Sequence, residues 1–309
     1  MHEPVLLREV VERLNLAGAQ RAVDATLGGG GHAEALLNAM PATGLLLGLD
    51  ADPEAVARAR ERLSAFGARF RARRMRFSRL AEALAAEGWD AVDAVLFDLG
   101  VSSFQLDDAR RGFSFLHDGP LDMRMDPDAP LRAADLVNRR SERELEWLLR
   151  EYGEEPHARR IARRIVERRA RAPFARTAEL ADCVMAAVGG RRGARRHPAT
   201  RTFQALRMAV NGELEELATG LEAALQALRP GGRLAVIAFH SLEDRLVKRF
   251  ARAHEGRWES LPEGGTRWRG ERPAVRSVTR RAVTPSQEEC RRNPRARSAR
   301  LRIVERTEC

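Results

Sequence analysis

The sequence predicts an α/β fold in which a mostly parallel sheet carries helices on both faces and is interrupted by an inserted all-helical domain. Three observations support this prediction. Short apolar segments alternate with helical segments over residues 21–104, helical segments without strands follow up to residue 211, and the alternation then resumes. Continuous apolar strands alternating with helices are typical of a parallel sheet covered on both faces. We therefore expect a discontinuous α/β domain of residues 1–104 and 212–309, and an inserted helical domain of residues 105–211.

The first part of the α/β domain contains three predicted strands. Residues 21–26 form a short strand that ends in a glycine-rich turn, and residues 45–50 and 94–98 form apolar strands that each end in aspartate. Residues 33–39 and 53–66 are predicted helices, the second with Pro53 in its first turn, where proline is well tolerated. In a parallel sheet this order brings Asp50 and Asp98 to the same carboxyl edge.

The second part continues the sheet. A helix over residues 213–228, a turn at 229–232 and a strand over 233–239 repeat the pattern of the first part. Residues 275–283 and 301–305 have the composition of two further strands, which we expect to be added antiparallel at one sheet edge.

The composition is typical of a globular protein that attracts polyanions. At 309 residues and 44% hydrophobic content, the chain can form one large or two moderate domains. Its net charge of +10 favours nucleic acid or an anionic membrane as partner. The N-terminus lacks the features of a signal peptide, and no apolar run is long enough to span a bilayer, so we expect no membrane partner. The three widely spaced cysteines favour a reducing cytoplasm over a disulfide framework or a zinc site.

The glycine-rich turn from Asp24 to His32 is the first candidate for a binding site. Glycines between a strand and a helix let a ligand approach the backbone and the free N–H groups of the helix start, although four glycines also suit a purely structural turn. Asp50 ends the next strand, where a carboxylate can accept hydrogen bonds from both hydroxyls of a ribose. The two features together favour a cofactor that contains adenosine, and they leave NAD and S-adenosylmethionine open.

Asp98 is the second candidate, because it ends a strand at the edge where ligands of open α/β sheets bind. A turn or helix-capping aspartate is the alternative explanation. Small residues follow it, including Gly100 and Ser102, as an active-site loop requires.

Several blocks of this sequence resemble the bacterial 16S ribosomal RNA cytosine N4-methyltransferases, the MraW family. The blocks run almost end to end, and they occur in the same order. They are His2-Glu3-Pro4-Val5-Leu6-Leu7, Gly28 to His32, Asp98-Leu99-Gly100-Val101-Ser102-Ser103, Gln105-Leu106-Asp107, Arg111 to Phe115, Asp118 to Asp126, Tyr152-Gly153-Glu154-Glu155, His197 to Ala205, Phe239 to Arg245, and Asn293 to Arg297.

The resemblance implies a Rossmann-like class I methyltransferase fold that uses S-adenosylmethionine. It further implies transfer of a methyl group to the N4 of a decoding-centre (P-site) cytosine of 16S rRNA, in the small (30S) ribosomal subunit. Expected cofactor contacts are Gly30, Gly31, His32, Asp50, Phe77, Asp98 and Gln105. We expect no metal and no DNA partner. The oligomeric state stays open, with a homodimer among the options.

Methylation of the cytosine amine needs a hydrogen-bond acceptor for its N–H, because the nitrogen lone pair is conjugated with the ring. Many amino-methyltransferases place an acid or amide before two prolines and an aromatic, whereas here the sequence is Asp98-Leu99-Gly100-Val101. The candidates for catalysis are therefore Asp98, Ser102 and His240, with the backbone carbonyls of residues 99–101 and Ser241 as alternatives. A structural role in a turn explains the position of His240 equally well. Asp118, Asp122, Arg124 and Asp126 suggest a clamp on the substrate side.

Three arginine clusters predict contacts with RNA phosphates. They are Arg160, Arg164, Arg168 and Arg171 beside the apolar Ile161 and Ile165, then Arg191, Arg192, Arg195, Arg196 and Arg201, and finally Arg291, Arg292, Arg295 and Arg297. A solvated arginine-rich face is the alternative explanation for each. Two other functions remain as competing hypotheses: a non-catalytic basic RNA-binding or ribosome-assembly factor, and an NAD-dependent dehydrogenase.

Overall fold

The computed structural model of the chain describes residues 4–190, 197–269 and 273–307. It divides into two compact units, Met1–Gly100 with Leu214–Cys309, and Val101–Glu213. These bounds differ by a few residues from the division expected from the sequence, 1–104 with 212–309 and 105–211. His2, Glu3, Cys309 and the arginines of residues 191–196 lie outside the described residues.

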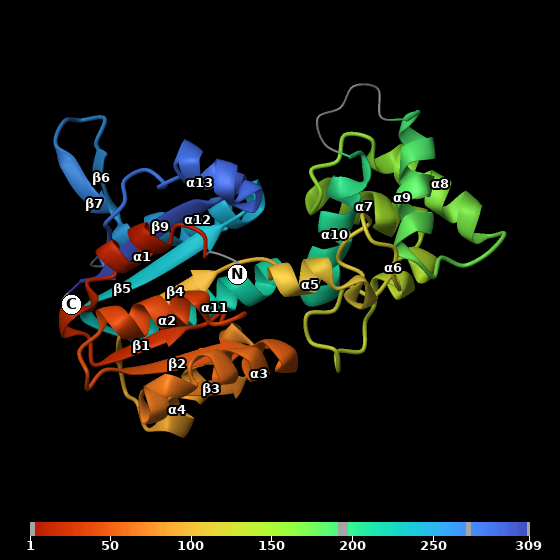
Figure 1. The fold of residues 1–309 in the computed structure, drawn as a ribbon. Helices are drawn as coiled ribbons and strands as arrows, with labels where there is room; N and C mark the ends of the chain where they lie inside the picture. The colour runs from red at the N-terminus through yellow and green to blue at the C-terminus, as the bar shows by residue number, and fades with distance from the viewer. Residues whose placement is uncertain (1–3, 191–196, 270–272, 308–309) are drawn as a thin grey trace. The chain divides into compact units, whose positions relative to one another are not determined.

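The first unit is built on a seven-stranded sheet in the order β3-β2-β1-β4-β5-β9-β8 (Figure 1). Its strands are β1 (Arg21–Asp24), β2 (Leu45–Asp50), β3 (Phe70–Arg74), β4 (Val92–Asp98), β5 (Leu228–Ala238), β8 (Val275–Ser277) and β9 (Arg300–Arg306). Strands β1 to β5 pair in parallel, whereas β9 pairs antiparallel with both β5 and β8. The predicted α/β fold with a mostly parallel sheet is therefore confirmed.

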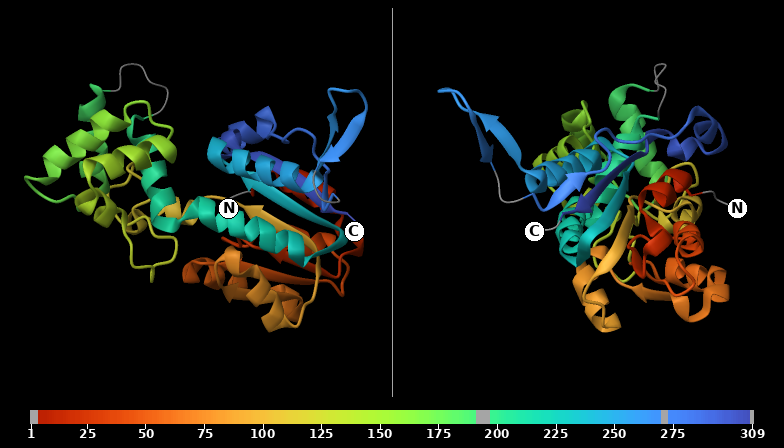
Figure 2. Two further views of the ribbon diagram at one scale, coloured as in Figure 1. Left: turned by 180° about the vertical axis from the view of Figure 1, so that it is seen from behind. Right: turned by 90° about the vertical axis from the view of Figure 1, so that its left-hand side faces the viewer.

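Helices cover both faces of this sheet, as the views in Figures 1 and 2 show. The helices are α1 (Leu7–Arg13), α2 (Gly31–Ala39), α3 (Pro53–Arg62), α4 (Leu80–Glu87), α11 (Glu213–Ala227), α12 (Ser241–Glu255) and α13 (Gln287–Arg292). Neighbouring strand residues point to opposite faces, so Val23 and Val95 pack with α4, α11 and α12, while Ala22 and Leu96 pack with α1, α2 and α3. Both sets are fully buried, which explains why these strands have continuous apolar sequences.

Three elements differ from the expected ones. Strand β3 has the sequence Phe-Arg-Ala-Arg-Arg, and its low apolar content concealed it because it lies at the sheet edge, where half of its surface faces solvent. Strand β5 begins at Leu228 and includes the expected turn at 229–232, with a shift of register against β4 between Val92 and Ala94. The hairpin of β6 (Arg257–Ser260) and β7 (Thr266–Arg269) forms a separate two-stranded sheet that the sequence pattern did not predict.

The second unit is helical, with α5 (Ser103–Asp107), α6 (Ala133–Arg139), α7 (Glu142–Glu151), α8 (Ala158–Arg169), α9 (Thr177–Val188) and α10 (Ala199–Asn211). Ile161 and Ile165 of α8 are buried in its core, as the apolar side of the arginine stripe predicted. Within the described part of this unit, the one strand-like pairing is an isolated bridge between Pro120 and Arg176. Among all described residues, no helix has the length and apolar character needed to cross a membrane.

Candidate active site

The glycine-rich turn joins the end of β1 to the start of α2. Gly28 and Gly30 have φ values of 51° and 77°, a left-handed backbone that glycine adopts at little cost. The Gly28 N–H donates to Asp50 Oδ2 over 2.8 Å, and Leu27 N–H donates to the Leu49 carbonyl, so β2 holds the turn in place. No side chain caps the N-terminus of α2, which leaves its first N–H groups available to a ligand.

Asp50 lies beside this turn, as the sequence predicted, and its two oxygens have defined partners. Oδ2 accepts from Gly28, and Oδ1 accepts from the Asp52 N–H over 2.9 Å. Asp52 in turn caps α3 by accepting from Glu54 N–H. Asp50 therefore aligns the glycine turn with the start of α3. Each carboxylate oxygen can accept more than one hydrogen bond, so these contacts leave room for a ribose. The role of Asp50 as a ribose acceptor stays a prediction.

His32 and Asp98 form a pair at the carboxyl ends of β1 and β4. His32 Nδ1 lies 3.3 Å from Asp98 Oδ2, and His32 Nε2 lies 3.0 Å from the Val5 carbonyl oxygen. Because a carbonyl can only accept, Nε2 carries a proton, and the Nδ1–Asp98 contact needs a second one. Burial alone lowers the pKa of His32, but the hydrogen bond and charge of Asp98, the charge of Asp24 and the Val5 carbonyl together raise it above its ordinary value. The geometry thus favours an imidazolium that donates to Asp98.

A second carboxylate, Asp24, lies buried behind this pair at the end of β1. It is 1% exposed, and one oxygen accepts from Thr26 N–H while the other has no partner within the described residues. Burial raises the pKa of Asp24 to about 7, although the charge of His32 opposes this effect. The Thr26 hydroxyl accepts from the Asp98 N–H over 2.6 Å. Thr26 and His32 therefore hold Asp98 from within the glycine turn, while the charge of Asp24 acts on His32.

The N-terminal segment lies against the glycine turn, a role that the sequence motif at residues 4–7 did not disclose. A Cβ atom at Gly31 would lie 2.6 Å from Pro4 Cγ, so only glycine fits there. Val5 supplies the carbonyl that binds His32, and the Leu6 N–H donates to Glu289 Oε1 of α13 over 2.7 Å. The segment closes one side of the turn and fixes the orientation of the His32 ring.

Phe77 begins a short 3-10 helix, η3 (Phe77–Arg79), after β3. Its ring centroid lies 5.0 Å from that of Phe97, and a Cβ atom at Gly220 of α11 would lie 2.5 Å from the Phe77 ring. Gly220 therefore makes room for the aromatic side chain. The residue is only partly buried, so the structure leaves both roles in place: packing against the core and covering an adenine.

His240 lies at the N-cap of α12, and both of its ring nitrogens face Glu243. Its Nδ1 accepts from the Glu243 N–H, and its Nε2 lies 3.1 Å from Glu243 Oε1. Glu243 Oε2 accepts from the N–H groups of Phe239 and His240, which completes a capping box. His240 therefore caps α12, and its predicted part in catalysis stays a prediction.

Two predicted site residues, Ser102 and Gln105, lie in the second unit and cap α5 together. Ser102 Oγ accepts from the Gln105 N–H, and Gln105 Oε1 accepts from the Ser102 N–H. Gln105 is 7% exposed. Their local geometry serves the start of the helix that follows the Asp98 loop in sequence.

The acidic loop of the second unit binds its own neighbours. Asp122 forms a two-pronged ion pair with Arg124, which also donates to the Ala129 carbonyl. Asp118 pairs with Arg176 and accepts from the Ala178 N–H. These contacts fix the loop internally through Arg124 and to the start of α9 through Arg176. The expected substrate clamp stays a prediction.

The fold and the site define the class of protein. Dinucleotide-binding folds continue their sheet beyond the fifth strand with a parallel strand. Here the antiparallel β9 is inserted between β5 and β8. The glycine turn and the acids at the ends of β2 and β4 belong to the parallel part of the sheet. Among the described residues, no side chain caps α2 and the buried Asp98 Oδ1 has no hydrogen-bond partner, and both features suit a ligand that supplies polar groups. The protein is a class I methyltransferase with S-adenosylmethionine as its cofactor.

The chain belongs to the MraW methylase family, whose model matches residues 1–307. It is 52% identical over 309 residues to the ribosomal RNA small subunit methyltransferase H of Syntrophobacter fumaroxidans, with 98% of this chain and 96% of the relative covered. It is also 52% identical over 305 residues to the enzyme of the same name from Thermomicrobium roseum, with 99% and 93% covered. The family resemblance noted in the sequence is confirmed.

Proposed function

We propose that this chain transfers the methyl group of S-adenosylmethionine to the exocyclic N4 of a decoding-centre (P-site) cytosine of 16S rRNA in the 30S subunit. The names of its relatives support small-subunit rRNA as the substrate class. The observation that carries the choice of an amine is the Asp98 carboxylate, held by His32 at the carboxyl end of β4 with one oxygen unpartnered. The cytoplasm, where ribosomal subunits occur, is the proposed location.

The reaction requires the N4 nitrogen to bond to the methyl carbon while the carbon–sulfur bond breaks and sulfur keeps the electron pair. S-adenosylmethionine supplies the electrophilic methyl group. The N4 nitrogen must then lose a proton. Holding the amine in line with the methyl group accounts for much of the rate enhancement, because it converts a bimolecular step into an oriented one.

Asp98 is the proposed acceptor for the N4–H. A carboxylate that accepts a hydrogen bond from the amine N–H favours a more tetrahedral nitrogen, whose lone pair can point at the methyl carbon. His32 is a positioning residue in this scheme, because its ring holds Asp98 Oδ2 and is itself held by Val5. His240 and Ser102 cap α12 and α5, and their predicted part in catalysis stays a prediction.

The proposed cofactor contacts follow the glycine turn and the strand ends. Gly30, Gly31 and His32 lie at the start of α2, where Gly31 and His32 offer backbone N–H groups and the Gly30 N–H donates to the Leu27 carbonyl. Asp50 accepts from the ribose, and Phe77 covers the adenine. The His32 ring is 6% exposed and bound at both nitrogens, so the contribution of this residue to the cofactor is through its backbone. Asp98 and Gln105 complete the proposed set.

Arginines on each unit are the proposed contacts to RNA phosphates. On α8, Arg160 and Arg164 are exposed, while Arg168 lies over the Phe174 ring and near Glu179. On the first unit, Arg291, Arg292, Arg295 and Arg297 are exposed around α13 and the 3-10 helix η5 (Pro294–Ser298). The N4 of a paired cytosine is not accessible, so the target base must be unpaired or flipped out.

The test is methyl incorporation into 30S subunits purified from a strain that lacks this gene, followed by nucleoside mass analysis. The expected product is N4-methylcytidine at a single decoding-centre position. Label in 5-methylcytosine or in adenine contradicts the proposal. Protein-free 16S rRNA, assayed in parallel, shows whether the assembled subunit is required.

Calorimetry separates the competing functions. A methyltransferase binds S-adenosylmethionine and not NAD, whereas a dehydrogenase does the reverse. A non-catalytic assembly factor binds neither but still binds RNA. Absence of heat with S-adenosylmethionine overturns the leading assignment.

A further inference from the structure

One segment of the first unit holds a large share of the positive charge of the protein. Residues 58–79 contain nine arginines and a single acid, Glu61, in a chain whose net charge is +10. The segment runs from the end of α3 through the 3-10 helix η2 (Ser64–Arg69) and β3 to η3. None of the three arginine clusters noted in the sequence includes it.

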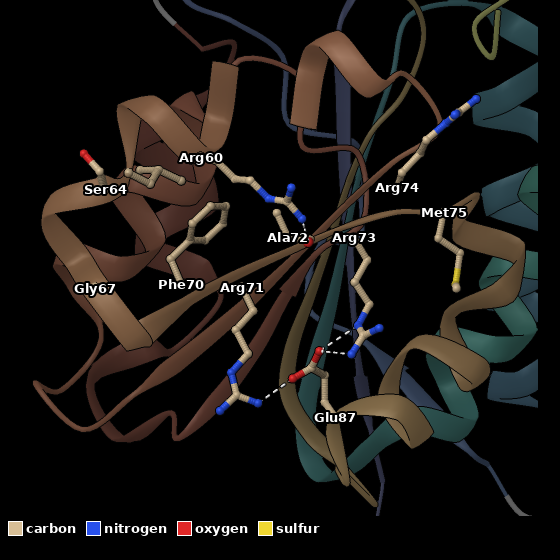
Figure 3. Close-up of a pocket in the computed structure, with 11 residues that line it drawn as sticks. Arg60, Ser64, Gly67, Phe70, Arg71, Ala72, Arg73, Arg74, Met75 and Glu87 are labelled. Atoms are coloured by element: carbon tan, nitrogen blue, oxygen red, sulfur yellow. Dashed lines mark hydrogen bonds and ion pairs between the residues drawn. The ribbon is translucent and has the colours of Figure 1, made fainter. Parts of the chain in front are cut away.

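A groove of about 720 Å³ lies on this segment, along the free edge of β3 (Figure 3). It is lined by Arg60, Leu63, Ser64, Gly67, Phe70, Arg71, Ala72, Arg73, Arg74, Met75 and Glu87. Four of these side chains are arginines and one is acidic, so the groove is a cationic channel with a small apolar floor.

The arginines of the groove are held in fixed positions. Arg71 and Arg73 both bind Glu87 at the end of α4, and Figure 3 shows this carboxylate between them. The Glu87 side chain is 6% exposed, whereas Arg71 and Arg73 are 43% and 37% exposed. Burial raises the pKa of Glu87, but the hydrogen bonds from both arginines outweigh this and lower it. Two guanidinium groups thus share one negative charge and keep exposed donors.

The same edge is closed to the addition of a protein strand. An edge strand normally presents unpaired backbone groups on which another strand can pair. Here the Arg60 guanidinium donates to the Ala72 carbonyl over 2.7 Å, and arginines occupy three of the five positions of β3. These features disfavour the pairing of a peptide strand with β3. They favour a polyanion in the groove, because the planar guanidinium group of arginine can donate two hydrogen bonds to one phosphate.

The groove ends near the proposed active site. The Met75 N–H, directly after β3, donates to the Asp50 carbonyl over 2.9 Å, and Phe77 follows two residues later. The carboxyl end of β3 therefore belongs to the same sheet edge as Asp50 and Asp98. A chain of phosphates in the groove leads directly to that edge.

We propose that this groove binds the phosphate backbone of the RNA strand that flanks the target nucleotide. The inference rests on the proposed rRNA substrate and adds a docking surface on the catalytic unit. Arg71 and Arg73 grip the phosphates, Glu87 orients both, and Arg60 covers the strand edge. The grip sets the affinity for RNA and leaves the methyl-transfer step unchanged.

The test uses the full chain with Arg71→Gln, Arg73→Gln and Glu87→Gln combined, which removes one net positive charge and leaves no orphaned carboxylate. The matched control is Arg8→Gln on α1, an exposed arginine outside the groove whose loss also removes one charge. Affinity for unmethylated 30S subunits and for protein-free 16S rRNA is measured from 50 to 200 mM salt. The affinity of each variant for S-adenosylmethionine is measured by calorimetry, and a wild-type value indicates that the fold is intact.

The expected result is a 5- to 30-fold rise in KM for RNA with kcat unchanged. The plot of log affinity against log salt should become shallower by ~0.7 for each phosphate that the variant no longer binds. The control should match the wild type. If the triple variant does not fold, Arg71→Gln alone leaves Glu87 paired with Arg73 and has the same expected direction.

Three outcomes would overturn the proposal that this groove binds RNA. The first is a salt slope and KM equal to those of the control. The second is a loss of kcat with KM unchanged. The third is a loss of subunit affinity while protein-free rRNA binds as before, which makes the surface a protein contact. Failure of the wild-type chain to methylate or bind rRNA at all overturns the proposed function instead, and the two failures are therefore distinguishable.

Discussion

Two histidines of the first unit, His32 and His240, each lie at the start of a helix after a strand and face a carboxylate. His32 is 3.3 Å from Asp98, and His240 is 3.1 Å from Glu243. The Glu243 carboxylate is 3% exposed and accepts from two backbone N–H groups as well as facing His240. The Asp98 side chain is 26% exposed, and its Oδ1 has no partner among the described residues.

The difference lies in the remaining hydrogen-bonding capacity. His240 Nδ1 accepts from the Glu243 N–H and completes a helix cap, while the buried His240 Nε2 lies 3.1 Å from Glu243 Oε1 without a hydrogen-bond partner among the described residues. His32 meets acceptors at both nitrogens, which calls for two protons, and its carboxylate keeps capacity for another donor. The two histidine–carboxylate pairs therefore differ: one caps a helix, and the other leaves a carboxylate that we propose as the acceptor at the site.

The largest expected effect is on the rate of methyl transfer, and it should differ between variants of Asp98 and Glu243. Asp98→Asn should lower the single-turnover rate of methyl transfer on the order of 10²–10⁴-fold, because the amine loses its charged acceptor. Glu243→Gln should leave that rate within a few fold and lower the free energy of unfolding by about 1–3 kcal/mol. Rapid-quench assays and denaturant titrations measure the two quantities. Equal losses of rate in both variants would contradict the comparison.

Asp50 sharpens the comparison, because its oxygens also accept backbone N–H groups and yet are predicted to bind ribose. Asp50→Ala should weaken the affinity for S-adenosylmethionine by about 1–3 kcal/mol, since polar partners are left unpaired. Asp50→Asn retains one acceptor oxygen for Gly28 and should lose less. Calorimetry measures both, and unchanged affinity in the alanine variant removes Asp50 from the site.

The buried Asp24 predicts a pH dependence of the free energy of unfolding. Its folded-state pKa of about 7 lies above the ordinary value of 3.8, so the protonated form is favoured in the folded chain. The stabilisation is complete below pH 4 and is lost as the pH rises towards 7, by up to about 1.4 kcal/mol per pH unit. The raised pKa of His32 adds a loss in the same direction above pH 6.5.

Asp24→Asn should therefore flatten the free energy of unfolding between pH 4 and 7. Guanidinium titrations at several pH values measure it. A slope in the variant equal to that of the wild type would show that Asp24 is not the group responsible.

The smallest expected effect concerns His240. His240→Ala should cost about 1 kcal/mol of stability through loss of the helix cap, and His240→Asn, a good N-cap residue, should restore most of it. Methyl transfer should remain close to wild type in both variants at a temperature where both are folded. A large loss of kcat in the asparagine variant would return His240 to the catalytic set.

The sequence predicted the α/β fold because its signals are local. Apolar strands such as residues 45–50 and 94–98 are buried on both faces, so their hydrophobic runs are continuous. β3 was not predicted from the sequence, because an edge strand needs little apolar surface and five residues with three arginines resemble a solvated loop. The hairpin β6–β7 was not predicted either, because its two strands pair only with each other and not with the main sheet.

The candidate site was predicted as a set of residues and not as an arrangement. Asp50 and Asp98 follow from strand ends, and His32 from the family motif. That His240 caps a helix, and that the Val5 carbonyl fixes the tautomer of His32, follow from contacts between segments distant in sequence. Hydrogen-bond partners of this kind carry no local signal.

By itself, the sequence determined the fold class, the order of the elements and the family, because hydrophobic periodicity, strand-terminal acids and long motif blocks are properties of consecutive residues. Only the tertiary structure decided which histidine supports an acceptor and which caps a helix. It also gathered the arginines of β3 and Arg60 of α3 into one groove, with Glu87 of α4 between two of them. The physical reason is that charge and hydrogen bonding act through space, and the chain brings these groups together only when it folds.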